Sequence, residues 1–277
     1  MMSVAIGVVV GLALGLTGAG GSVFAVPLLM FALGLPLSEA APIALLAVAA
    51  AAAFGTLVAW DVTHIRYRAA LLMAATGLIA APLGVIAAAH LATALLTAMF
   101  AAVLVTVALR LLAQSLRRPE ETTVVRATVS GEGSPSTGPI CGLHASSGRL
   151  LWNGPCAATL SGIGAVTGFL SGLLGVGGGF VIVPSLRAST PLSMHSAVAT
   201  SLMAIALTSA STAMLTLAMG RPLPWAIAAP FVGGSLVGML CGRRLAGRVA
   251  GPMLQQGFAV LMLFAAAALL IKSLGKT

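Results

Sequence analysis

The sequence predicts an all-α polytopic membrane protein. Of its 277 residues, 59% are hydrophobic and only 7% are charged, whereas soluble domains carry about 25% charged residues. So few charges cannot solvate a globular surface, so we expect much of the surface to face lipid. The length suits about eight spans of about 20 residues each and one sizeable loop.

A duplicated glycine motif predicts that these spans form two repeated halves. The segment Gly15–Ser22 reads GLTGAGGS, and the segment Gly172–Gly179, 157 positions later, reads GLLGVGGG. The register extends in both directions, because Gly7, Gly11, Gly15 and Pro27 recur as Gly164, Gly168, Gly172 and Pro184. Doubled hydrophobic halves with matching Gly and Pro interruptions are typical of transporters that bind their substrate where the halves meet.

The hydrophobic pattern divides the chain into three parts. Residues 1–112 form the first membrane repeat, 113–153 a polar linker, and 154–277 the second membrane repeat. Each half is expected to hold four segments, the first of them broken at its glycine-rich loop. The apolar stretches in order are 3–16, 23–35, 40–60, 69–88 and 92–112, then 157–173, 180–186, 194–219, 222–241 and 251–271.

The broken segments bear on the topology. As one helix, residues 3–35 would extend about 49 Å, against a hydrocarbon thickness of about 30 Å. If each broken segment enters the membrane, turns at the glycines and exits on the same side, three crossings remain in each half. With an odd number of crossings, the two halves would be inverted. Four full crossings per half, with the broken segment unwound, would make the halves parallel. We favour inversion.

The basic residues predict the orientation. In the inverted arrangement 11 basic residues lie on one side and 3 on the other, and in the parallel arrangement 10 and 4. Both place the 113–153 linker in the cytoplasm, so we expect a multi-pass membrane protein with this linker on the cytoplasmic side. The net charge of +9 does not indicate nucleic-acid binding, because the basic residues are scattered between apolar segments.

The three cysteines, Cys141, Cys156 and Cys241, have no CxxC spacing, so no metal site is implied. Cys141 and Cys156 can pair only if the linker is extracytoplasmic. Because the charge pattern places it in the cytoplasm, three unpaired thiols are expected.

The glycine loops are the candidate binding site for a small anion. Non-helical backbone at membrane depth is tolerated only where protein buries it or where it lines a wet cavity. Each loop precedes an apolar half-helix, so its N–H groups lie at the positive end of that helix. Alternatively the glycines only allow close helix packing, which we favour for the upstream ladders but not for the consecutive glycines. The candidate substrate-binding residues are Thr17, Gly18, Gly20, Gly21, Ser22, Gly175, Gly177, Gly178 and Gly179.

Three further candidates follow in the second half: His195, Thr200 and Ser201. The two hydroxyls fall about one and a half turns inside a helix and can point inward, although such side chains often bond back to their own helix. His195 can contact an anion or relay protons, or it can simply be solvated at the interface. No arrangement of Ser, His, Asp or Cys predicts catalysis, so neither an enzyme nor a cofactor or metal is expected.

The doubled motif Gly-Leu-x-Gly-x-Gly-Gly, with a proline downstream and then His195-Ser196-Ala197-Val198-Ala199-Thr200-Ser201-Leu202, resembles the TauE/SafE family of sulfite-exporter-type permeases. The resemblance implies movement of sulfite, sulfoacetate or related oxyanions across the bacterial cytoplasmic (inner) membrane, in which we expect this multi-pass protein to lie. It places the site on Gly18, Gly20, Gly21, Gly177, Gly178, Gly179, Thr200 and Ser201. The chain departs from the family where the first half has Pro42-Ile43-Ala44 in place of a Gly-Thr-Ser-like stretch.

The sequence therefore predicts a secondary transporter of small anions, in the direction of export, with the lipid bilayer as surroundings and no nucleic acid as partner. The alternative is a non-transporting accessory or assembly protein that grips partner helices with its glycines. A homodimer is left open.

Overall fold

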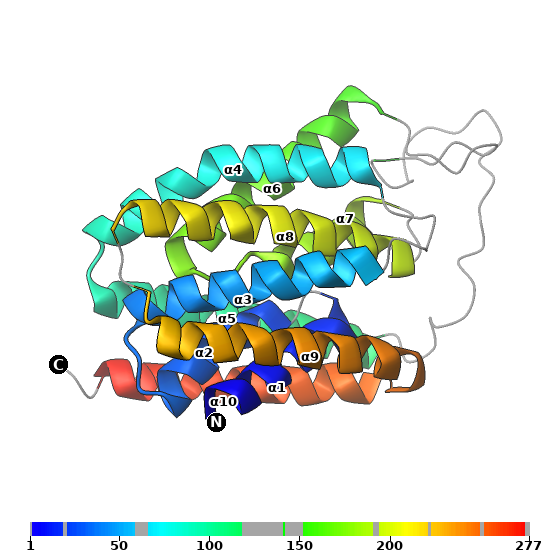
Figure 1. Ribbon diagram of the computed structural model, residues 1–277. Helices are drawn as coiled ribbons and strands as arrows, with labels where there is room; N and C mark the ends of the chain where they lie inside the picture. Colours follow the sequence, from blue (N-terminus) through cyan, green and yellow to red (C-terminus); the bar gives the residue numbers. More distant parts are fainter. Residues whose placement is uncertain are drawn as a thin grey trace.

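The computed structural model describes residues 2–18, 21–58, 66–117, 141, 152–190, 194–220, 223–249 and 252–274. The described residues form helices and no strand (Figure 1). The helices are α1 Met2–Thr17, α2 Gly21–Ala32, α3 Leu37–Val58, α4 Tyr67–His90, α5 Thr93–Arg117, α6 Gly154–Leu174, α7 Gly179–Ser189, α8 Met194–Ala218, α9 Trp225–Val249 and α10 Pro252–Leu274.

The helices confirm that the chain is an all-α protein with several apolar segments. Within the described residues, five helices are long and apolar enough to cross a membrane: Leu37–Val58, Tyr67–His90, Gly154–Leu174, Ser196–Ala218 and Trp225–Leu245. Shorter apolar helices cover Met2–Thr17, Gly21–Ala32, Leu95–Arg110 and Ala259–Leu269. The predicted breaks are present, because α1 ends at Thr17 before α2 begins at Gly21, and α6 ends at Leu174 before α7 begins at Gly179.

The glycine ladder of α1 packs on the backbone of α9. A Cβ on Gly7 would meet the carbonyl of Phe231, and a Cβ on Gly11 would meet the carbonyl of Ser235. A Cβ on Gly15 would lie 2.8 Å from the carbonyl oxygen of Met239. Only glycine allows this approach, and the rising numbers on both helices show that α1 and α9 run parallel.

The second ladder packs in the same way, on α4. Gly164, Gly168 and Gly172 of α6 face the backbone of Met73, Gly77 and Ala81, respectively. Helices α6 and α4 are therefore also parallel. Close packing through small residues is common between membrane helices, so the interpretation of both ladders as packing surfaces is confirmed.

The directions of the central helices follow from contacts between them. The hydroxyl of Ser235 on α9 donates a hydrogen bond to the carbonyl of Ala47 on α3 (3.4 Å), and Arg243 Nη1, two turns further along α9, donates to the carbonyl of Gly55. Helices α3 and α9 are thus parallel, and so are α1 and α3. Helix α2 must therefore return toward the side from which α1 started.

Helices α6, α7 and α8 likewise run out, back and out again. The Arg66 N–H, just before α4, donates to Thr200 Oγ1 of α8 (3.2 Å), and Gly77 lies against Thr208. Helices α4, α6 and α8 are therefore parallel, and α7 returns between α6 and α8. Helices α3 and α8 are antiparallel neighbours in the middle of the bundle (Figure 1). We call the end at which α4 begins and α9 ends the arginine-rich end, since it carries Arg66, Arg68, Arg243 and Arg244.

A disulfide corrects the expectation of three unpaired thiols. Cys141 and Cys156 are bonded, with their Cα atoms 5.0 Å apart, and only Cys241 is free. The pairing follows from the return of α7 to the end at which α6 begins. The Cys141 N–H donates to the carbonyl of Ser189 at the end of α7 (3.1 Å), which places Cys141 beside the first turn of α6. Charge counts cannot anticipate this contact. Of the predicted 113–153 linker, residues 118–140 and 142–151 lie outside the described residues, and 113–117 complete α5.

Candidate functional site

The turn between α6 and α7 depends on glycine conformations. Gly175 caps the end of α6 with φ 72°, and its N–H donates to the carbonyl of Ser171 (2.8 Å). Gly177 has φ 72°, and Gly178, with φ 66°, is the residue that precedes α7. Residues with a Cβ rarely adopt these angles. Among the described residues no side chain caps the start of α7, so its first N–H groups point into the turn with the positive end of the helix dipole.

The turn between α1 and α2 has the same beginning. Gly18 has φ 72°, and its N–H donates to the carbonyl of Leu14 (2.8 Å), as Gly175 does in α6. Gly21 and Ser22 are buried at the start of α2, and a Cβ on Gly21 would strike the backbone of Leu14. Gly20 lies outside the described residues.

The two turns lie toward opposite ends of the bundle. Gly18 faces Val198 near the start of α8, and Gly175 faces Ala41 near the start of α3. Because α3 and α8 are antiparallel, these positions are far apart along the bundle. Gly177 reaches deeper, since Val48 of α3 and Ser209 of α8 both lie beside it.

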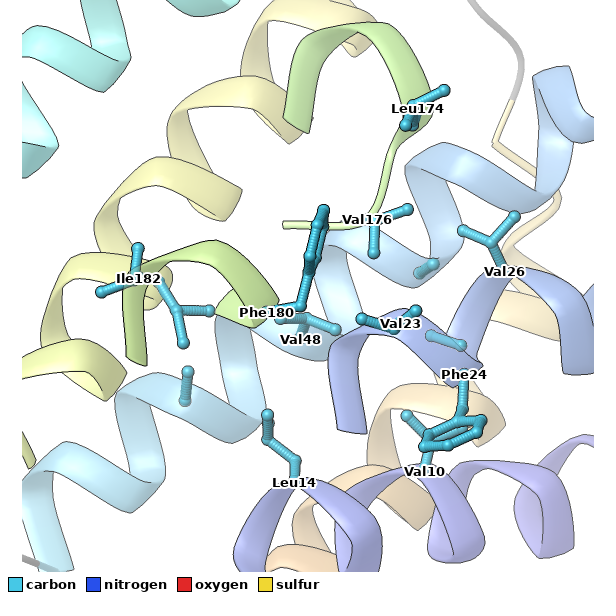
Figure 2. Packing of buried hydrophobic residues seen from close by; sticks show 14 of the residues in the cluster. Val10, Leu14, Val23, Phe24, Val26, Val48, Leu174, Val176, Phe180 and Ile182 are labelled. Atoms are coloured by element: carbon cyan, nitrogen blue, oxygen red, sulfur yellow. The ribbon is translucent and has the colours of Figure 1, made fainter. Parts of the chain in front are cut away.

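Apolar side chains fill the space between the two half-helices. Helices α2 and α7 contact each other, and the buried side chains of Val23, Val48, Val176 and Phe180 belong to one cluster. Figure 2 shows Val23 and Phe180 on facing helices, with Val48 and Val176 beside them. An apolar contact therefore lies between the two half-helices, and an apolar constriction of this kind excludes water and ions.

A cavity of about 230 Å³ lies on one side of this contact, at the end opposite the arginine-rich end. All of the described residues that line it are uncharged. The cavity has room for several water molecules, each of which occupies about 30 Å³. Its polar and glycine lining comes from four helices and the second turn, and includes Ser38, Thr93, Gly172, Gly175 and Thr216.

The predicted hydroxyls have different partners. Thr17 Oγ1 donates to the carbonyl of Ala13 (2.7 Å), and Ser201 Oγ donates to the carbonyl of Val198 (2.8 Å), so both bond back to their own helices. Thr200 is fully buried and accepts the Arg66 N–H, which ties the start of α4 to α8. His195 belongs to the first turn of α8, away from Gly177, which lies beside the middle of that helix.

Sequence reasoning missed Ser209. Its side chain is fully buried, and its Oγ has no hydrogen-bond partner within the described residues. A Cβ built on Gly177 would lie 2.5 Å from this oxygen, so the hydroxyl faces the glycine turn. A signal existed, because Thr208, Ser209, Thr212 and Thr216 place hydroxyls three and four residues apart in an apolar segment. That spacing gathers them on one face.

Comparisons with known proteins agree with a transporter. The family described as "Sulfite exporter TauE/SafE" matches residues 3–269. A "Probable membrane transporter protein" of Xylella fastidiosa strain 9a5c is 31% identical over 251 residues, which cover 90% of this chain and 85% of that protein. The protein of the same description from strain Temecula1 is 30% identical over 255 residues, with the same shares covered. No solved structure matches the chain. The match over nearly the whole length shows that this multi-pass membrane protein belongs to the sulfite exporter TauE/SafE family.

Proposed function

We propose that the protein is a secondary transporter that exports small oxyanions, sulfite or an organosulfur or organic oxyanion, across the bacterial inner membrane. The observation that carries the proposal is the turn Gly175–Gly179, whose left-handed glycines lead into α7 with no side-chain cap. Such a turn offers N–H groups and a helix dipole to an anion. It also adjoins an uncharged cavity. The description of the family as sulfite exporters supports the substrate class.

We propose further that the chain consists of two inverted repeats. Three pairs of contacts support this relation. Helix α1 packs on α9 as α6 packs on α4, and α3 packs on α9 as α8 packs on α4. Gly18 faces Val198, and Gly175 faces Ala41. Gly175 stands 157 positions after Gly18, and Val198 stands 157 positions after Ala41. Inverted repeats permit alternating access by rocking one half against the other.

The orientation sets the energetics of export. With the arginine-rich end in the cytoplasm, as the basic residues favour, the cavity opens toward the periplasm. Export of a monoanion then releases about 2.3 kcal/mol per 100 mV of inside-negative potential. Such export needs neither ATP nor a coupling ion, and the uncharged lining of the cavity contains no carboxylate that would bind one.

The alternative of a non-transporting accessory protein has less support. It requires glycine surfaces that are free to grip another protein. The ladders Gly7–Gly15 and Gly164–Gly172 contact α9 and α4 of this chain instead.

Flux measurements test the proposal. The purified protein in proteoliposomes is expected to carry labelled sulfite, thiosulfate or sulfoacetate saturably and faster at a membrane potential that drives anions outward. Acetate serves as an anion without sulfur, and protein-free liposomes give the leak. If no oxyanion crosses faster than in protein-free liposomes, the protein is not a transporter of this class.

A further inference from the structure

We propose that hydroxyls along α8, from Thr216 through Thr212 to Ser209, form the polar route by which an oxyanion passes from the cavity to Gly177. Within that route, Ser209 is a ligand of the oxyanion. The inference rests on the proposed function and assigns to it an asymmetric site, carried by the second half alone.

Ser209 carries the argument because its hydroxyl is both buried and unused. The side chain is 0% exposed, and within the described residues its Oγ neither donates nor accepts a hydrogen bond. Buried polar atoms are nearly always paired, so an unpaired one indicates a missing partner. The hydroxyl faces Gly177, one residue before the left-handed Gly178 that precedes α7. An oxyanion at this point would accept the Ser209 O–H together with N–H groups at the start of α7.

The hydroxyls between Ser209 and the cavity are continuous along one face of α8. Thr216 lines the cavity and is nearly fully buried. One turn deeper, Thr212 is fully buried and accepts a hydrogen bond from Ser171 of α6 (3.4 Å). Ser209 follows three residues deeper, on the same face. The route therefore ends beside the apolar contact of Val48, Val176 and Phe180.

The hydroxyls differ in what they can donate. Thr216 Oγ1 donates to the carbonyl of Ala213 and Thr212 Oγ1 to that of Thr208, both within α8. Either hydroxyl would give up that bond to serve an anion. Ser209 has no such bond within the described residues, so its O–H can serve a ligand without losing another partner. Neutral donors favour an anion whose several oxygens each accept a hydrogen bond, as those of a sulfur oxyanion do.

The first half does not offer the same route. With the 157-residue offset of the repeat, Ser209 corresponds to Ala52 of α3 and Thr212 to Gly55. The side chain of Met239 packs against Gly55, where a Cβ would strike it, and the carbonyl of Gly55 accepts a hydrogen bond from Arg243. At the positions of α3 equivalent to Ser209 and Thr212 there is therefore no hydroxyl, and the neighbouring Thr56 donates its O–H to the carbonyl of Ala52 in its own helix.

The first test compares Ser209→Ala with Ser211→Ala in the flux assay. Ser211 is a matched control on the same helix, since its hydroxyl bonds back to the carbonyl of Thr208. Ser209→Ala removes an unpaired buried hydroxyl, so the folded protein should melt at the same temperature or higher. We expect its KM for sulfoacetate to rise about tenfold, the effect of one lost hydrogen bond to a charged ligand. Equal KM values for the two variants would overturn the assignment of Ser209.

The second test is independent of flux. In a Cys241→Ser background, Thr216→Cys and Ser209→Cys are exposed to the anionic thiol reagent 2-sulfonatoethyl methanethiosulfonate. We expect both to be modified, sulfoacetate to slow the reaction at position 209, and Ser211→Cys to stay unmodified. Modification at 216 but not at 209 would overturn the route even if the wild-type protein transports. Absence of wild-type flux with modification at both positions would instead contradict the proposed function and leave the route standing.

Discussion

At Gly178 two separate constraints exclude any other residue. Its φ of 66° is unfavourable for a residue with a Cβ, and a Cβ at this position would also strike the side chain of Thr167. Gly175 combines the same two constraints, because it has φ 72° and faces Ala41. The geometry of the second turn is therefore fixed by individual glycines, each of which holds backbone N–H groups in place.

We expect Gly178→Ala to abolish flux and to lower the stability of the protein, and thermal unfolding in detergent together with transport measures both. Gly220→Ala is the matched control for backbone strain alone, since Gly220 has φ 76° with open space around it. It should cost about 1–2 kcal/mol and retain transport. Gly162→Ala, at an open helical position, should be neutral or stabilising. Transport by Gly178→Ala at the wild-type rate would contradict the role of the turn.

Single residues also show what sequence reasoning can reach. Consecutive glycines predicted both turns, because no other residue tolerates such backbone. The sequence could not decide whether Thr200 and Ser201 face a ligand, since hydroxyls on a helix have many partners. In the structure Ser201 bonds back to Val198 and Thr200 accepts the Arg66 N–H. The sequence could not single out Ser209. What distinguishes it is a buried hydroxyl with no hydrogen-bond partner within the described residues, and this depends on how the helices pack.

At the scale of the elements, two helix pairs determine the arrangement. Helices α1 and α9, and helices α6 and α4, approach so closely that a Cβ on a glycine of either ladder would strike the backbone of the partner helix. Their sequences predicted this packing, because glycines at every fourth position form a smooth face. Segment length alone allowed two courses for α2 and α7: each could turn back at its glycine loop or continue across the membrane. In the structure, α1 and α3 both run parallel to α9, so α2 runs back between them.

The disulfide lies at the arginine-rich end, where α6 begins and α7 ends. Cys141 bridges to the first turn of α6, and its N–H bonds to the end of α7. The bridge spans a sequence separation of 15 residues, for which loop-closure entropy gives about 3 kcal/mol. We expect Cys141→Ser to lower stability by about that amount in thermal unfolding. In a gel-shift assay, maleimide–polyethylene glycol should label one thiol in the oxidised protein and three after reduction.

The same thiols report the orientation of the whole bundle. Disulfides persist in oxidising compartments, whereas the positive-inside rule predicts that this end lies in the cytoplasm. With the arginine-rich end in the cytoplasm, Cys141 and Cys156 should be reduced in growing cells and form the bridge on oxidation. Alkylation of whole cells before lysis would then block all three thiols. A bridge already complete in growing cells would place this end in the periplasm and reverse the proposed direction of the cavity.

For the molecule as a whole, the sequence predicted an all-α membrane protein and the helix breaks at both glycine turns. It did not predict the apolar contact between α2 and α7. Val23, Val48, Val176 and Phe180 look like ordinary core residues along the chain. Their meeting between α2 and α7 depends on how two distant segments fold back. The site we propose is therefore one-sided: a cavity, a row of hydroxyls and one glycine turn, next to an apolar contact that must open during transport.

The location of a bound oxyanion tests this account most directly. Selenite resembles sulfite in shape and charge, and selenium scatters anomalously, so crystals grown with selenite would locate the anion unambiguously. We predict an anomalous peak between Gly177 and Ser209 in the wild-type protein, weaker in Ser209→Ala. A peak only beside the arginines of the opposite end, or no peak within the bundle at saturating selenite, would contradict it.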